Sequence, residues 1–127
     1  MTFGSLGKLF EPGSFLLRQG EIGDSMFVIE EGEVEILVQR DGELHRMRVA
    51  GRGEVIGEMA LFVKSPRSAS VRALGPVRAL TLDKRAFMKR VHEDPSLAYH
   101  ILQVMSRRVK ELSDELARLK GIAAHGV

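Results

Sequence analysis

Turn-forming residue pairs divide the first two thirds of this sequence into short segments. Asp41-Gly42 is the strongest of these turns, because both residues tolerate the positive φ angles that a two-residue hairpin requires. Pro12-Gly13, Glu31-Gly32 and Gly75-Pro76 are also typical of turns. The segments between the turns are apolar or alternate between apolar and polar residues, most clearly over residues 33–40. Closely spaced short strands of this kind predict a β-sandwich or a barrel-like roll.

The predicted strands cover residues 14–18, 26–29, 33–40, 43–49, 67–74 and 77–82, and residues 1–9 are either a frayed end or a first strand. Residues 43–49 are rich in polar side chains, which predicts a strand at the edge of a sheet. After residue 82 the pattern becomes helical. Asp83 is suited to cap a helix over residues 84–93, and Asp94-Pro95 is suited to begin a second helix that continues to Lys120 and ends at Gly121.

The second predicted helix carries apolar residues spaced alternately by four and three. They are Ala98, Leu102, Met105, Val109, Leu112, Leu116 and Leu119. This spacing is typical of a coiled-coil seam. A helix that packs only on its own domain usually has a wider apolar face, so the pattern favours a parallel homodimer over intramolecular packing.

Residues 57–71 combine the residue types that an anion site needs. Arg67 offers a planar fork of donors to a phosphate, and Glu58 offers an acceptor to a sugar hydroxyl. The backbone N–H groups of Met59 and Ala60 would lie at the start of a short helix, where an anion is attracted. Gly57 allows a close backbone turn. The alternative is an ordinary surface Glu–Arg pair joined by a loop.

Composition limits the remaining classes of function. The chain has 127 residues and no cysteine, which suits one domain without disulfides or thiolate chemistry. Its formal charge of +2, with acids and bases mixed, does not favour non-specific nucleic-acid binding. No apolar run is long enough for a membrane helix, and the N-terminus does not resemble a secretion signal, so we expect a cytoplasmic protein. The histidines are scattered, so we expect neither an enzyme nor a metal site.

The residues from Gly57 to Leu61, followed by those from Pro66 to Val71, resemble the phosphate-binding cassette of the cyclic nucleotide-binding domain family. This family includes the regulatory subunits of cyclic AMP-dependent kinase, gated ion channels and the bacterial catabolite activator protein. Gly20-Glu21-x-Gly23-Asp24 and Met26-Phe27-Val28-Ile29-x-x-Gly32 are also similar to the family's early strands and turns. The similarity extends over about residues 8–120.

The resemblance implies an α+β fold: an antiparallel, jelly-roll-like β-roll of about eight strands, a short cassette helix and C-terminal helices. We expect the roll over residues 1–82, hinge and dimerisation helices over 83–120, and a flexible tail over 121–127. By matching positions, Arg67 would contact the cyclic phosphate and Glu58 the ribose 2′-OH. Further donors or small neighbours would come from Gly57, Met59, Ala60, Ser68 and Ala69. Ile36, Val49 and Val71 are candidate apolar walls, although each is equally well explained as a core residue.

The long helix resembles the dimer helix of the catabolite activator group. In that group a Thr-Ser pair contacts the purine, and the matching positions here are Leu112 and Ser113. Leu112 departs from the pattern, so the choice of base stays open. Cyclic AMP is favoured, and cyclic GMP is the alternative, because the Ser68 hydroxyl could reach the exocyclic amine of a syn guanine.

The sequence therefore predicts a non-catalytic cyclic nucleotide receptor that transmits a helix rearrangement to a dimer or to a protein effector. The chain ends soon after the long helix, so we expect no direct DNA binding by this chain and no contact with a membrane. The start at Met1 and the glycine-ended tail slightly favour a free-standing chain. One alternative is a ligand-free interaction domain. Another is the regulatory fragment of a larger transcription factor or channel.

Overall fold

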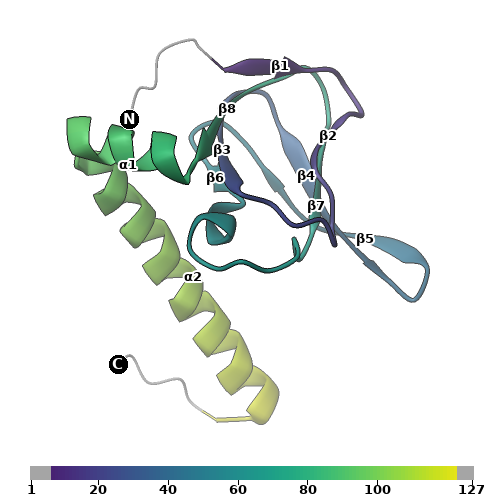
Figure 1. The fold of residues 1–127 in the computed structure, drawn as a ribbon. Coiled ribbons are helices and arrows are strands. Elements are labelled where there is room, and N and C mark those ends of the chain that lie inside the picture. The colour runs from purple at the N-terminus through teal and green to yellow at the C-terminus, as the bar shows by residue number, and fades with distance from the viewer. Residues whose placement is uncertain (1–6, 123–127) are drawn as a thin grey trace. The chain divides into compact units, whose positions relative to one another are not determined.

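The computed structural model describes residues 7–122, and their contacts divide the chain between Lys89 and Arg90 into two compact units. The first unit contains a roll of antiparallel strands, a short 3-10 helix and the beginning of α1 (Figure 1). The second unit contains the end of α1 and the long helix α2. The predicted division at residues 82/83 stays a prediction, and residues 1–6 and 123–127 lie outside the described part of the chain.

Within residues 7–122, eight strands form two four-stranded antiparallel sheets. The strands are β1 (Lys8–Phe10), β2 (Phe15–Leu17), β3 (Ser25–Glu31), β4 (Val34–Arg40), β5 (Glu43–Ala50), β6 (Val55–Ile56), β7 (Ser70–Ala73) and β8 (Val77–Asp83). One sheet has the order β1-β8-β3-β6 and the other has the order β2-β7-β4-β5. The predicted α+β roll of about eight strands is confirmed.

The β4–β5 hairpin forms where the sequence predicts it. Asp41 and Gly42 have φ angles of 54° and 79°, which are the two positive values that a type I′ turn needs. β5 lies at the end of its sheet, so the prediction of an edge strand is confirmed.

The strand predicted from residue 67 begins later, at Ser70. Arg67 pairs with a loop instead: its N–H donates to the carbonyl of Glu21 (2.8 Å), and its own carbonyl accepts from the N–H of Gly20 (2.8 Å). These two bonds hold Arg67 beside residues 20–24, in an irregular segment before the strand. The apolar-small pattern of residues 67–74 could not reveal this, because the partner segment is more than 40 residues away in the sequence.

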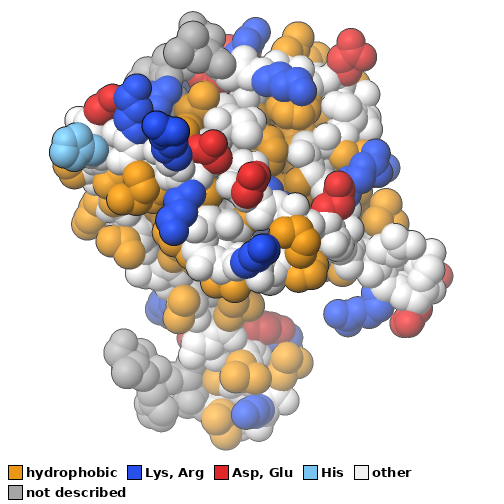
Figure 2. All heavy atoms as spheres, in the orientation of Figure 1, with side chains coloured by type: hydrophobic (Ala, Val, Ile, Leu, Met, Phe, Trp, Pro, Cys, Tyr) orange, Lys and Arg blue, Asp and Glu red, His pale blue; other side chains and the backbone are white. Residues whose placement is uncertain are grey.

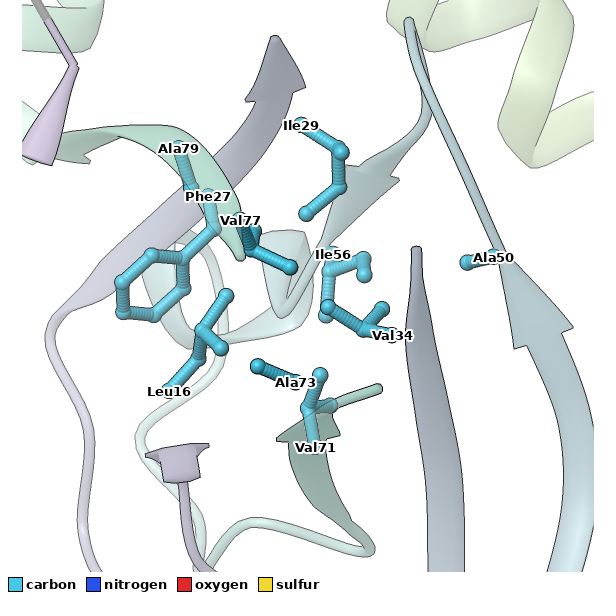
Figure 3. Close-up of a cluster of buried hydrophobic side chains, with 10 residues drawn as sticks. All are labelled: Leu16, Phe27, Ile29, Val34, Ala50, Ile56, Val71, Ala73, Val77 and Ala79. Atoms are coloured by element: carbon cyan, nitrogen blue, oxygen red, sulfur yellow. The ribbon is translucent and has the colours of Figure 1, made fainter. Parts of the chain in front are cut away.

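The core lies between the two sheets. Figure 3 shows its side chains converging from both sheets. The buried cluster consists of Leu16, Phe27, Ile29, Val34, Ala50, Ile56, Val71, Ala73, Val77 and Ala79, and Phe10, Leu17 and Ile36 pack against it. Burial of this apolar surface is the main force that holds the roll together.

A buried carboxylate lies on β4. The side chain of Glu35 accepts hydrogen bonds from Arg72 Nε (2.9 Å) and Arg46 Nε (3.1 Å), on the two neighbouring strands. The bond from Arg72 is the largest cause that holds the pKa of Glu35 below its ordinary value, and burial acts in the opposite direction. Glu35 therefore joins three strands of this sheet while it is ionised.

The helices begin and end as their capping residues predict. Asp83 Oδ1 accepts from the N–H of Ala86 (2.7 Å) at the start of α1 (Lys84–Glu93). Asp94 Oδ1 accepts from the N–H of Ser96 (3.1 Å) at the start of α2 (Ser96–Lys120). Gly121 ends α2 in the left-handed conformation, with a φ of 70°.

Basic and acidic side chains are mixed over the face drawn in Figure 2, in keeping with the balanced charge of the sequence. Among residues 7–122, no helix has the length and apolar character that a membrane span requires.

Candidate functional site

The short helix η1 (Glu58–Leu61) carries the predicted acid. Gly57, directly before it, has a φ of 76° and a ψ of 19°, a left-handed conformation that glycine adopts without strain. Glu58 is the first residue of η1, and only 1% of its surface is exposed. A carboxylate this deeply placed in a small loop helix is uncommon, since acids are seldom fully buried unless they have partners.

The guanidinium of Arg67 is directed at the residue before Glu58. Its Nη1 donates to the carbonyl of Gly57 (3.0 Å), and its Nη2 donates to the carbonyl of Ser25 (2.7 Å). The structure thus brings the two predicted charged residues to the same turn, on segments ten residues apart in the chain. The alternative of an unrelated surface pair does not fit, because Glu58 is buried and Arg67 is tied to the backbone on two sides.

Two glycines leave room for this guanidinium. A Cβ atom at Gly23 would lie 2.2 Å from Nε of Arg67, and one at Gly57 would lie 2.6 Å from Nη1. Both distances are far below van der Waals contact. Any side chain at either position would therefore displace the guanidinium.

Burial lowers the pKa of Arg67, while the carboxylates of Asp24 and Glu21 act in the opposite direction. An arginine begins so far above neutrality that it stays charged at physiological pH. The site therefore holds a permanent positive charge, partly removed from water, that suits an anion.

The other predicted residues of the cassette are less constrained. The N–H of Ala60 donates to the carbonyl of Gly57 (3.2 Å), so it closes the turn of η1. Met59 and Ser68 are exposed, and Ala69 is half-buried. Their contacts with a ligand stay predictions.

The strand register separates the three predicted apolar walls. Ile36 lies opposite Val71, so both belong to the core side of the sheet. Val49 lies opposite Glu35, which is the next residue along β4 and faces the other side. The register thus brings Ile36 and Val71 together on one face of the sheet and places Val49 on the opposite face.

The two residues predicted to contact the base, Leu112 and Ser113, are exposed and lie on α2 in the second unit. Their contact with a base stays a prediction. Among residues 7–122, no cluster of three or more His, Asp or Glu side chains could hold a metal ion.

The sequence interpretation assigned no role to Gly23 and Ser25, although the structure places both against Arg67. The two glycines and two acids of residues 20–24 were visible as a turn. A turn alone does not reveal which distant side chain it accommodates.

Comparisons with known proteins identify the family of this chain. The family model for the cyclic nucleotide-binding domain matches residues 8–94, and the chain therefore belongs to the cyclic nucleotide-binding domain family. Within that family it is similar to parts of several kinds of protein. It is 35% identical over 81 residues to a cAMP-dependent protein kinase regulatory subunit of Blastocladiella emersonii, covering 63% of this chain and 20% of that one.

It is also 38% identical over 91 residues to the cGMP-dependent protein kinase egl-4 of Caenorhabditis elegans, covering 69% of this chain and 12% of the kinase. Among solved structures, the catabolite activator protein of Thermus thermophilus superimposes with a TM-score of 0.81 at 26% identity, covering 89% of this chain and 54% of that one. The chain thus spans about half of this regulator and a smaller part of the two kinase proteins.

Proposed function

We propose that this chain is a non-catalytic receptor for a cyclic nucleotide, with cyclic AMP and cyclic GMP as the two candidate ligands. One observation carries the proposal: the guanidinium of Arg67 donates to the carbonyl of Gly57, at the start of the short helix that buries Glu58. A fixed cation and a buried acid beside a single turn suit a ligand that joins an anionic phosphate to a sugar hydroxyl.

Arg67 would exchange partners when the ligand binds. In the structure its donors meet two neutral backbone carbonyls, of Gly57 and Ser25. A phosphate oxygen carries charge and is the stronger acceptor. The cyclic phosphate would therefore draw the guanidinium from at least one carbonyl, which gives binding a direct effect on the position of η1.

The base is a separate question. The relatives include proteins named for cyclic AMP and for cyclic GMP. The phosphate and ribose contacts proposed for residues 57–71 would serve both nucleotides alike, so they do not choose between the bases.

We further propose that the signal leaves the domain through a homodimer of α2 or a protein effector. Five seam residues of α2 are more than half exposed in the single chain: Leu102, Val109, Leu112, Leu116 and Leu119. An apolar stripe of this length suits a second copy of the helix. The ligand would act by shifting the population of helix arrangements, which requires tighter binding to one of them.

The roles of Arg67 and Glu58 can be tested by calorimetry with cyclic AMP, cyclic GMP and their 2′-deoxy analogues. Arg67→Ala should weaken binding of all four ligands by at least about tenfold, because it removes charge-assisted hydrogen bonds to the phosphate. Arg85→Ala, at an exposed position, is the matched control.

Glu58→Gln should weaken the ribose ligands much more than the deoxy ligands, because only ribose has the 2′-OH. Circular dichroism must first establish that this variant folds, since Glu58 is buried. Equal losses for ribose and deoxyribose ligands in a folded variant would contradict the assigned role.

A further inference from the structure

Gln19, shortly after the end of β2, is held by both its backbone and its side chain. Its N–H donates to Oγ of Ser70, the first residue of β7 (2.8 Å). Its side-chain amide forms two hydrogen bonds with the backbone of Gln39 on β4. Oε1 accepts from the N–H of Gln39 (2.7 Å), and Nε2 donates to its carbonyl (3.3 Å). One residue therefore joins the end of β2 to the start of β7 and to β4.

The amide of Gln19 occupies a place on β4 that a strand would otherwise take. β4 and β7 pair as far as Leu37, which lies opposite Ser70. Each step forward along β4 is a step backward along β7, so two further steps in the same register would place Gln39 opposite Ser68. A side-chain amide has the same kinds of acceptor and donor as a peptide group. Gln19 therefore satisfies the backbone groups of Gln39 that Ser68 would meet in a longer β7.

The chain before β7 has a different partner. The carbonyl of Arg67 accepts from the N–H of Gly20 (2.8 Å), and the N–H of Arg67 donates to the carbonyl of Glu21 (2.8 Å). Residues 68–69 form a bend between this pairing and the first residue of β7. The chain thus exchanges β4 for the loop that directly follows Gln19.

This exchange decides where the guanidinium of Arg67 lies. From its place beside the loop, Arg67 donates to the carbonyls of Gly57 and Ser25. A β7 that extended backward along β4 would draw the backbone of Arg67 away from the loop, and its side chain with it. The two arrangements compete, because the single N–H of Gln39 cannot donate fully to Gln19 and to Ser68 at once.

We propose that Gln19 is a positioning residue of the cyclic nucleotide site, whose amide keeps Arg67 beside the loop by occupying the edge of β4. The proposal rests on the proposed function of the cassette. Gln19 acts through Arg67 and not through a contact with the ligand. Loss of the amide leaves the backbone of Gln39 free to pair with Ser68, and it loosens the loop that aligns Arg67. The affinity for a cyclic phosphate should then fall while the core stays intact.

The variant that isolates the amide is Gln19→Met, because methionine keeps the length of the side chain and lacks both the amide acceptor and the amide donor. In calorimetry it should bind cyclic AMP and cyclic GMP about tenfold more weakly than the wild-type protein, since the phosphate contact is common to both ligands. Gln39→Met is the matched control. It makes the same substitution at an exposed residue whose backbone carries the contact, so both affinities should stay unchanged.

A second measurement needs no ligand. Amide hydrogen exchange, followed by NMR, reports on the N–H groups of Gly20 and Arg67, which hold the loop and the cassette together. Both should exchange faster in Gln19→Met than in the wild-type protein or in Gln39→Met. The N–H groups of β3 and β8 should keep their protection. A role confined to overall stability would instead speed exchange throughout the roll and lower the melting temperature.

The inference is overturned if Gln19→Met binds both cyclic nucleotides as tightly as Gln39→Met does. It is also overturned if the affinity falls while Gly20 and Arg67 keep their protection, or if protection falls throughout the roll. A folded wild-type protein that binds neither cyclic nucleotide would instead reject the proposed function. The exchange measurement would still decide whether Gln19 positions Arg67.

Discussion

The guanidinium of Arg67 occupies space that two glycines leave open. Gly23 carries no positive φ, so alanine is compatible with its backbone, yet the added Cβ would lie within 2.4 Å of three guanidinium atoms. Moving the flexible Arg67 side chain away from this Cβ should cost less free energy than moving the backbone of the loop.

Gly23→Ala should therefore weaken cyclic nucleotide binding by about tenfold while it changes the melting temperature little. Calorimetry and thermal denaturation measure the two effects. Gly75→Ala is the control, because a Cβ there has no atom within 4 Å. Unchanged affinity in Gly23→Ala would mean that the guanidinium reaches the ligand from another position.

Glu35 makes stability depend on pH. Its hydrogen bonds from Arg72 and Arg46 hold the pKa of its carboxyl below the ordinary value in the folded state. The carboxyl of Glu35 therefore binds a proton more readily in the unfolded state than in the folded state. The stabilisation is fully present at pH values above the pKa of the unfolded state, and it is lost as the pH falls through the lowered pKa of the folded state.

Thermal melts from pH 7 down to pH 3 should show a steeper loss of stability in the wild-type protein than in Glu35→Gln, which has no charge to lose at this position. The variant should be less stable at pH 7, because it weakens a buried pair. Parallel pH profiles for the two proteins would exclude Glu35 as a source of the acid sensitivity.

The long helix α2 carries the seam that the sequence predicts for a homodimer. Ion pairs flank its apolar residues, including Lys110 with Asp114 (2.8 Å) and Arg118 with Glu115. Such pairs add little to stability, so the exposed leucines should dominate any association.

Leu116→Glu should shift the protein toward the monomer in sedimentation equilibrium, because it places a charge within the seam. Gln103→Glu introduces the same charge at an exposed position outside the seam. It should leave association unchanged. Equal behaviour of the two variants, both dimeric or both monomeric, would argue against this seam as the interface.

The hairpins and helix ends of the chain were predictable because their causes are local. Asp41-Gly42 sets its own turn, and Asp83 caps the helix that directly follows it. The contacts of Arg67 with Gly23 and Ser25 were not predictable in this way, because they join segments that meet only after the roll has closed.

The position of Arg48 illustrates the same limit. Simple alternation along residues 43–49 does not reveal a register shift between strands, yet that shift decides which arginine faces the core side of the sheet. Cyclic AMP, which the sequence favoured, stays a prediction. Recognition of phosphate and ribose by residues 57–71 stays a prediction from the sequence.

The account as a whole depends on cyclic nucleotide binding at the turn shared by Gly57, Glu58 and Arg67. Titration of the wild-type protein with cyclic GMP and cyclic AMP, each compared with its linear 5′-monophosphate, tests this most directly. Saturable binding of at least one cyclic nucleotide, with one ligand per chain and much weaker binding of the linear form, is the predicted result. A folded protein that gives no saturable heat with either cyclic nucleotide would contradict the account.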